Sequence, residues 1–161
     1  MSSTTPHKRL NIGVTSSHGG HLDELLELLL ALEGHDFFFF CYDAPTTRTL
    51  ERAYLVPNMA RNPIAFLKNL WRVWCIFRRE RPDAIVSTGA EIAIPVWLVG
   101  RLWRAPLCYI ECGAQVATPS VTGRVLSRFA RAFFVQWPEL LPAYHGRARY
   151  AGSLIAEDPP R

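Results

Sequence analysis

Leu10-Asn-Ile-Gly-Val-Thr15, followed by Ser16-Ser-His-Gly-Gly-His21, decides the fold of this chain. The first stretch is short and apolar, which predicts a buried strand. Leu22–Leu32 comes next, with apolar residues at helical spacing and carboxylates in the opening turns, where the helix dipole favours negative charge. A strand, a glycine turn and a helix in this order are typical of the first unit of a parallel α/β sheet.

The same alternation continues along the chain. Short apolar runs predict further strands at 37–42, 84–87, 107–111, 132–136 and 148–152. Helical spacing predicts helices at 63–79, 92–102 and 123–131, and a short one at 49–54. Strands that alternate with helices at this spacing predict an α/β fold with a Rossmann-like, mostly parallel sheet and helices on both faces.

The composition is that of a soluble globular domain. Of the 161 residues, 49% are hydrophobic and 20% are charged, which is too apolar for a disordered chain. No apolar stretch reaches the ~20 residues that a membrane-spanning helix needs, and the polar N-terminus does not predict a secretory signal. The four cysteines indicate reduced thiols of a cytoplasmic protein. We expect a disordered tail at 1–9, one domain at 10–155 and a C-terminal tail at 156–161.

The net charge of +4 is unevenly distributed. Residues 1–60 hold 4 basic and 7 acidic side chains, whereas residues 61–104 hold 8 basic and 3 acidic ones. A basic region attracts phosphate groups, which nucleic acids, anionic lipids and small ligands all carry, although a solubilising surface would explain it equally well. No pattern of a nucleic-acid-binding fold is present, so nucleic acid is the least favoured partner.

The glycine turn at 16–21 is the first candidate site. Ligands of open parallel sheets bind at the carboxyl ends of strands, where helix N-termini offer free N–H groups. Gly19 and Gly20 let the backbone approach an anion, and His18 and His21 flank them. The alternative is a tight strand-to-helix turn with two solvated histidines. The Gly-x-Gly-x-x-Gly and P-loop patterns are absent, and no third ligand follows at metal-site spacing, so we expect neither a cofactor nor a metal.

Five further motifs follow the glycine turn in order. They are Pro82-Asp-Ala-Ile-Val-Ser-Thr-Gly-Ala-Glu91, Pro95, Ala105-Pro-Leu-Cys-Tyr-Ile-Glu-Cys-Gly113, Thr122-Gly-Arg-Val-Leu126 and Phe134-Val-Gln-Trp-Pro138. Together they resemble the N-terminal, acceptor-binding half of MurG-like GT-B glycosyltransferases. The resemblance is closer to a stand-alone form of that half: the anchor subunit of the dolichol-pathway UDP-N-acetylglucosamine transferase of eukaryotes, and the bacterial PssD and EpsE-like exopolysaccharide proteins. It covers about residues 10–152.

This resemblance implies two catalytic residues. The glycine turn would face the diphosphate and sugar of a lipid-linked acceptor, with His21 as the base for the acceptor hydroxyl, because a neutral imidazole suits proton removal. Glu111 matches an acidic residue expected to contact the acceptor or to orient the base. A strand-end carboxylate that caps a neighbouring turn is an equally good interpretation of Glu111.

The resemblance also implies a set of residues that bind the acceptor and its phosphates. They are His18, Gly19, Gly20, Thr88, Gly89, Glu91, Thr122, Gly123 and Arg124. His18 departs from the small residue of the family. Gln115 stands where the eukaryotic branch usually has an arginine, which weakens a phosphate-binding role for that loop.

The predicted helix 63–79 carries a broad apolar arc. Leu67, Trp71 and Trp74 lie in this arc near Arg78, a pattern typical of an interfacial helix on an anionic bilayer. A helix that packs on the core and keeps its basic residues in water is the alternative. The eukaryotic relatives have an N-terminal membrane anchor that this chain lacks. We therefore expect peripheral attachment to the cytoplasmic face of the inner membrane.

A complete GT-B enzyme binds the sugar nucleotide mainly in its C-terminal half. The resemblance therefore implies a separate donor-binding subunit that holds a UDP-sugar, while this chain holds a polyprenyl-diphosphate-linked saccharide. Gln136, Trp137 and Pro138 are expected at the contact between the two, unless Trp137 simply packs in the core. The expected function is that of one subunit of a glycosyltransferase of polysaccharide biosynthesis, inactive alone. A non-catalytic membrane scaffold that recruits a glycosyltransferase is the alternative.

Overall fold

The computed structural model describes residues 8–60 and 62–154. The C-terminal tail expected at 156–161 lies outside the described residues, and so does most of the tail expected at 1–9. Lys8 and Arg9, which belong to that N-terminal tail, form exposed ion pairs with Asp83 and Asp36.

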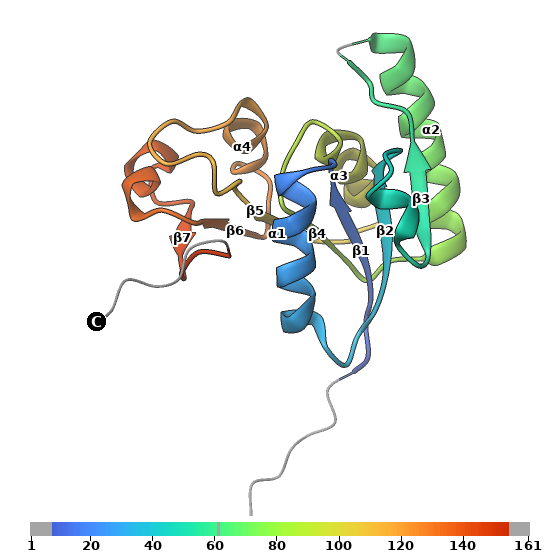
Figure 1. The fold of residues 1–161 in the computed structure, drawn as a ribbon, viewed down its shortest axis with the longest axis horizontal. Helices are drawn as coiled ribbons and strands as arrows, with labels where there is room; N and C mark the ends of the chain where they lie inside the picture. Colours follow the sequence, from blue (N-terminus) through green and yellow to red (C-terminus); the bar gives the residue numbers. More distant parts are fainter. Residues whose placement is uncertain (1–7, 61, 155–161) are drawn as a thin grey trace, which may run out of the picture.

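Seven strands of the described chain form one parallel sheet in the order β3-β2-β1-β4-β5-β6-β7 (Figure 1). They are β1 (Asn11–Ser16), β2 (Asp36–Tyr42), β3 (Ala53–Val56), β4 (Ala84–Ser87), β5 (Leu107–Ile110), β6 (Ala132–Val135) and β7 (Arg149–Tyr150). The strand order changes direction between β1 and β4, and ligands of such sheets bind outside the carboxyl ends of the strands at this switch point. The glycine turn that follows β1 lies there.

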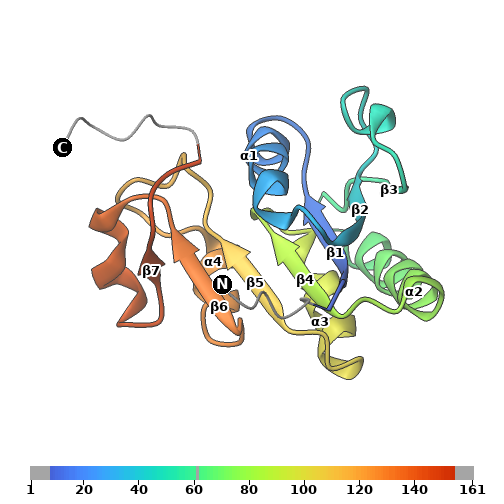
Figure 2. The same ribbon diagram turned by 90° about the horizontal axis from the view of Figure 1, so that it is seen from below.

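Helices cover both faces of the sheet (Figure 2). The helix α1 (Gly20–Leu28), continued by a 3₁₀ turn at Leu29–Leu32, lies on one face. The helices α2 (Pro63–Glu80), α3 (Ala93–Leu102) and α4 (Val121–Leu126) lie on the other. The predicted α/β, Rossmann-like fold with a parallel sheet is confirmed.

Each face of the sheet has its own apolar core, because successive side chains of a strand point to opposite faces. On the α1 face, Val14 of β1 packs with Leu25 of α1. On the opposite face, Phe38 of β2 packs edge-to-face against Phe77 of α2, with ring centroids 6.5 Å apart. Gly13 of β1 lets Phe38 lie close to the sheet, since a Cβ at this position would be 3.1 Å from the ring.

The prediction of a short helix at 49–54 is wrong. A 3₁₀ turn at Thr47–Thr49 is followed by β3, which pairs with β2 so that Phe39 opposes Ala53. Arg52, immediately before β3, has a φ of 50°, a left-handed conformation that interrupts a helix. Pairing with β2 gives the backbone of β3 its hydrogen-bond partners, and this tertiary contact decides the conformation of the segment.

The helix predicted at 123–131 is shorter than expected and begins earlier. It is α4, which starts after Ser120 because the Ser120 hydroxyl accepts a hydrogen bond from the Gly123 N–H at 2.8 Å. The sequence also gave no indication of the 3₁₀ helix at Pro138–Tyr144 that precedes β7.

The start of α2 rests on a side-chain cap. Asn62 Oδ1 accepts hydrogen bonds from the backbone N–H groups of Ile64 (2.9 Å) and Ala65 (3.3 Å), and Pro63 occupies the first helical position. We predict that Asn62→Ala lowers the free energy of unfolding by about 1 kcal/mol in urea denaturation. Asn62→Asp keeps an acceptor and is the control. Equal losses in the two variants would contradict a capping role.

Candidate functional site

The glycine turn presents open backbone at the start of α1. Gly19 has a φ of +71°, which glycine adopts without strain, and its carbonyl accepts from the N–H of Leu22 at 2.7 Å. A Cβ at Gly19 or Gly20 would meet nothing within 4 Å, so both residues face open space. The first N–H groups of a helix have no partner inside the helix and carry partial positive charge. This turn can therefore receive an anion.

Two hydrogen bonds join His21 to the loop after β4. His21 Nδ1 lies 3.0 Å from the Thr88 carbonyl oxygen, and the Thr88 hydroxyl donates to the His21 carbonyl at 2.7 Å. A carbonyl oxygen only accepts, so Nδ1 carries a proton, and in the neutral ring Nε2 keeps its lone pair. The backbone around Thr88 thus sets the tautomer that a general base requires.

Gly89 makes room for this ring. Its φ is +119°, and a Cβ at Gly89 would lie 3.0 Å from His21 Cε1. Any side chain at this position would be strained and would push against the imidazole. The loops after β1 and β4 therefore meet here, which brings His21, Thr88 and Gly89 together.

Glu91 lies further along the same edge, towards β2. The Tyr42 hydroxyl donates to its carboxylate at 3.1 Å. Burial raises the pKa of Tyr42, and the Glu91 carboxylate raises it further, so this hydroxyl stays protonated and remains a donor. Glu91 also borders a hollow of about 300 Å³ between α2 and α3.

His18, the other histidine of the glycine turn, is exposed to solvent.

Glu111 uses its carboxylate for hydrogen bonds within the chain. Its side chain is fully buried and accepts from the Ser120 hydroxyl at 3.1 Å, from the Cys112 N–H at 3.2 Å and from the Tyr144 hydroxyl. Burial and the Glu111 carboxylate raise the pKa of Tyr144, which therefore remains a donor. The structure corrects the catalytic assignment of Glu111: its carboxylate holds the 112–120 loop, as the alternative interpretation had it.

The start of α4 packs directly against this carboxylate. Thr122 and Gly123 are buried, and a Cβ at Gly123 would lie 1.9 Å from Glu111 Oε2. Neither residue presents a side chain to a ligand, contrary to the binding role expected of them. Arg124 is exposed on α4 and can reach a phosphate group.

The sequence interpretation missed Glu24, which organises the opposite wall of the site. Its side chain is only 2% exposed and lies one helical turn after His21. The Gly113 N–H donates to Glu24 Oε1 at 2.9 Å, and Gln136 Nε2 donates to Glu24 Oε2 at 2.8 Å. One sequence signal was available for Glu24. It lies between Leu22 and Leu25, on the apolar side of an amphipathic helix that is expected to be buried.

Gln136 is also buried, which corrects its assignment to a partner interface. Its amide nitrogen donates to Glu24, and its amide oxygen accepts from the Leu154 N–H at 2.8 Å. Trp137 is half-buried and donates from Nε1 to the Gly113 carbonyl at 2.6 Å, whereas Pro138 is exposed. Of the three residues, only Trp137 and Pro138 present surface to another protein.

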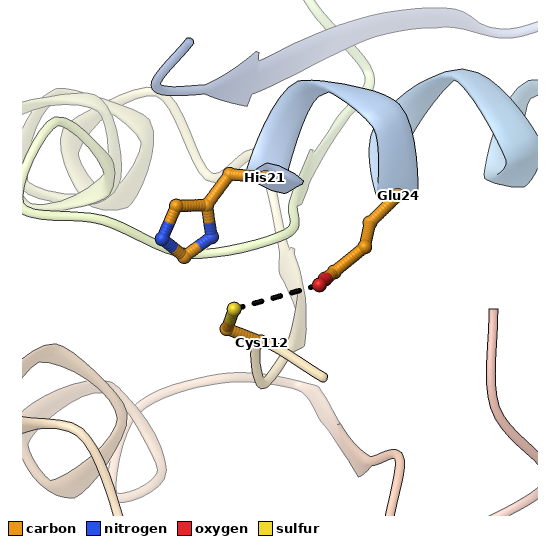
Figure 3. Close-up of side chains that lie close together, drawn as sticks. All are labelled: His21, Glu24 and Cys112. Atoms are coloured by element: carbon orange, nitrogen blue, oxygen red, sulfur yellow. Dashed lines mark hydrogen bonds between the residues drawn. The ribbon is translucent and has the colours of Figure 1, made fainter. Parts of the chain in front are cut away.

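Three potential metal ligands lie side by side at the first turn of α1 (Figure 3). One donor atom from each of His21, Glu24 and Cys112 lies within 4.8 Å of the other two. Cys112 Sγ donates to Glu24 Oε1 at 3.4 Å. Burial raises the pKa of the Cys112 thiol to about 11, and the adjacent Glu24 carboxylate contributes to this shift.

The predicted membrane residues divide into exposed and packed ones. Leu67 (63%) and Trp71 (67%) are largely exposed on α2, and Arg78 is exposed as well. Trp74 is half-buried and packs edge-to-face on Trp103, with ring centroids 5.6 Å apart, so it contributes mainly to packing. No helix in the described part of the chain is long and apolar enough to span a bilayer.

An apolar groove of about 730 Å³ runs between α2 and α3. Its lining residues are Leu67, Leu70, Trp71, Trp74, Trp97, Leu98, Val99, Arg101 and Leu102. Leu102 is 72% exposed at its rim, beside Leu67 and Trp71. The groove therefore presents apolar side chains from both helices to its surroundings.

We predict that Gly123→Ala lowers the free energy of unfolding by about 2 to 3 kcal/mol, because the new methyl group collides with the buried Glu111 carboxylate. Gly20→Ala is the control, since a Cβ there meets nothing and should change stability little. Urea denaturation of both variants measures the difference. Equal stabilities would show that Glu111 does not confine the start of α4.

Two solved structures illustrate the likeness of fold. MurG of Acinetobacter baumannii superposes with a TM-score of 0.67 and 20% identity, over 81% of this chain and 42% of that one. A UDP-N-acetylglucosamine 2-epimerase of Rickettsia bellii superposes with a TM-score of 0.74 and 10% identity, over 92% and 46%. At these identities the likeness establishes the fold, which is that of one half of a GT-B chain.

Among curated relatives, a "UDP-N-acetylglucosamine--N-acetylmuramyl-(pentapeptide) pyrophosphoryl-undecaprenol N-acetylglucosamine transferase" of Desulfitobacterium hafniense is 34% identical over 82 residues. The match covers 51% of this chain but only about a fifth (21%) of that enzyme. The "UDP-N-acetylglucosamine transferase subunit alg14" of Schizosaccharomyces pombe is 28% identical, over 83% of this chain and 78% of its own length. The human subunit ALG14 is 24% identical, over 94% and 86%.

A family match covers most of the chain. Residues 44–154 fit the family described as "Oligosaccharide biosynthesis protein Alg14 like". This segment includes the loop after β4, the buried Glu111 and Gln136, and the apolar groove between α2 and α3. The chain belongs to the Alg14-like family of oligosaccharide biosynthesis proteins.

Proposed function

We propose that this chain is the acceptor-binding subunit of a two-component glycosyltransferase. With a separate donor-binding subunit, it would transfer a sugar from a UDP-sugar to a polyprenyl-diphosphate-linked saccharide. The observation that carries this proposal is His21, which is held through Nδ1–H at the switch point of the sheet and whose Nε2 has no hydrogen-bond partner among the residues that the structure describes. Membership of the Alg14-like family supports it, as do the names of relatives that are UDP-N-acetylglucosamine transferase subunits.

The chemistry follows from the residues at the edge of the sheet. The N–H groups at the start of α1 and the open backbone of Gly19 and Gly20 would bind the acceptor diphosphate, with Arg124 as an additional cation. His21 Nε2 takes the proton of the acceptor hydroxyl as its oxygen attacks the anomeric carbon. The new bond joins that oxygen to the anomeric carbon, the bond to the UDP oxygen breaks, and configuration inverts. Glu91 and Tyr42 lie where they can contact the acceptor sugar.

The donor subunit completes the site in this proposal. The chain corresponds to 42% of the MurG chain and about a fifth of the D. hafniense transferase, so the matched region leaves most of those enzymes unaccounted for. A second subunit that holds the UDP-sugar would dock beside the carboxyl edge of the sheet. Half-buried Trp137 and exposed Pro138 are the proposed contact residues. The product would belong to an exopolysaccharide or capsule.

The apolar groove between α2 and α3 supports peripheral binding to a membrane. Leu67, Trp71 and Leu102 would enter the interfacial layer of an anionic bilayer, and Arg78 would meet its headgroups. Both helices begin at the carboxyl edge of the sheet, because α2 leads into β4 and α3 leaves it. We place the chain on the cytoplasmic face of the inner membrane.

The first test is sugar transfer by the chain together with its donor-binding subunit. We predict activity from the pair and none from either subunit alone. His21→Ala should lower kcat by about 10² to 10⁴, the usual contribution of a general base. His145→Asn changes an exposed histidine whose side chain makes none of the contacts described above. It is the control, because asparagine tolerates the left-handed conformation of His145.

Each result of this assay has one meaning. Turnover by the chain alone would overturn the two-subunit proposal. Full activity of His21→Ala in the pair would favour the non-catalytic membrane scaffold, which needs complex formation but no base.

The second test concerns the membrane. We predict that the double variant Leu67→Glu, Trp71→Glu binds anionic vesicles at least about tenfold more weakly in a sedimentation assay, because it places two carboxylates in the interfacial layer. Leu30→Glu is the matched control, since Leu30 is 69% exposed on the α1 side of the sheet. Equal losses in both variants would show that the groove is not the contact surface.

A further inference from the structure

The cluster of His21, Glu24 and Cys112 has the donor atoms of a transition-metal site. His21 and Glu24 lie one turn apart on α1, and Cys112 reaches them from the loop after β5 (Figure 3). Bonds of 2.0 to 2.3 Å to a tetrahedral Zn²⁺ separate its ligand atoms by about 3.3 to 3.8 Å. Cys112 Sγ and Glu24 Oε1 are already 3.4 Å apart, and the whole set lies within 4.8 Å.

The charge balance of Glu24 independently favours a cation at this place. A carboxylate that is 2% exposed pays a large desolvation cost unless a positive charge accompanies it. Its hydrogen-bond donors are the Gly113 N–H, the Gln136 amide and the Cys112 thiol, all of them neutral. None of the ion pairs among the described residues includes Glu24.

We propose that His21, Glu24 and Cys112 form a binding site for a thiophilic divalent cation of the Zn²⁺ class, and that the bound cation inhibits transfer by occupying His21. Imidazole, thiolate and carboxylate together suit Zn²⁺, whereas Mg²⁺ and Ca²⁺ prefer oxygen ligands only. Three protein ligands leave a fourth position for water.

Binding moves protons in a defined way. The cation replaces the thiol proton of Cys112, which is released to solvent, and its charge stabilises the thiolate. If the cation binds His21 Nδ1, the ring proton moves to Nε2. If the cation binds Nε2, it occupies the lone pair of that nitrogen. In either case Nε2 can no longer accept the proton of an acceptor hydroxyl.

The inhibitory part of this inference rests on the proposed function, but the binding part does not. Co²⁺ titration of the purified chain tests binding alone, because a cobalt–thiolate bond produces a charge-transfer absorption band. We expect the band at one equivalent of Co²⁺, its loss in Cys112→Ser, and at least a tenfold weaker affinity in that variant. Cys75→Ser, which removes an exposed cysteine on α2, should behave as wild type.

Three results would overturn the site: no thiolate band in the wild-type chain, a band that persists in Cys112→Ser, or displacement of Co²⁺ by Mg²⁺ as readily as by Zn²⁺. Serine can still donate a hydrogen bond to Glu24, so Cys112→Ser should fold. Cys112→Ala, checked by thermal unfolding, provides a second variant that lacks the ligand.

The assay with the donor subunit tests inhibition. Zn²⁺ should inhibit the wild-type pair, and a chelator should restore its activity. Cys112→Ser should keep its basal activity and require at least tenfold more Zn²⁺ for the same inhibition. Equal inhibition of both proteins would overturn the assignment of the effect to this site. If no sugar transfer is detected at all, the proposed function fails while the Co²⁺ titration still decides the binding site.

Discussion

A carboxylate buried without a counter-ion has to be surrounded by hydrogen-bond donors, and at Glu24 this requirement organises the carboxyl edge of the sheet. Its two oxygens accept hydrogen bonds from the Gly113 N–H in the loop after β5 and from the side-chain amide of Gln136 at the end of β6. Gln136 in turn accepts from the Leu154 N–H, so the segment after β7 joins the same network. One side chain of α1 thus connects the glycine turn to three later parts of the chain.

A second buried carboxylate, that of Glu111, connects segments of the chain around α4 by hydrogen bonds. The Glu111 carboxylate accepts hydrogen bonds from the hydroxyls of Ser120 and Tyr144. Gly123, which has no side chain, leaves space for this carboxylate. The two networks are linked, because Gln136 also donates to the Glu111 carbonyl at 3.1 Å. Between them they connect the loops after β5 and β6 to α1 and α4, close to the first turn of α1 where His21 lies. The same close packing brings the Cys112 thiol and the Glu24 carboxylate next to His21.

Polar residues in a motif were the least predictable part of the site. Glu111 was expected either to contact the acceptor or to cap a neighbouring turn, and Gln136 was expected at a partner interface. Both are buried, whereas Glu24 was overlooked although it is central. A sequence identifies a side chain as polar, but whether it faces a ligand or satisfies a buried partner depends on segments far away in the chain. Glu24 and Cys112 are 88 residues apart, and no spacing rule brings them together. On α2, the helical pattern likewise did not separate exposed Trp71 from Trp74, which packs on Trp103.

The features that the sequence by itself determined are local ones. Alternating apolar runs and helical stretches predicted the parallel sheet, Pro63 marked the start of α2, and the glycine turn marked the end of β1 at the candidate site. Only the tertiary structure decided that Ala53–Val56 is a strand, because its backbone needs β2 as a partner. It also decided which carboxylates are buried and which nitrogen of His21 is free, because the Thr88 carbonyl comes from another strand. Local propensity acts within a few residues, whereas burial and hydrogen-bond pairing arise from contacts that only the folded chain makes.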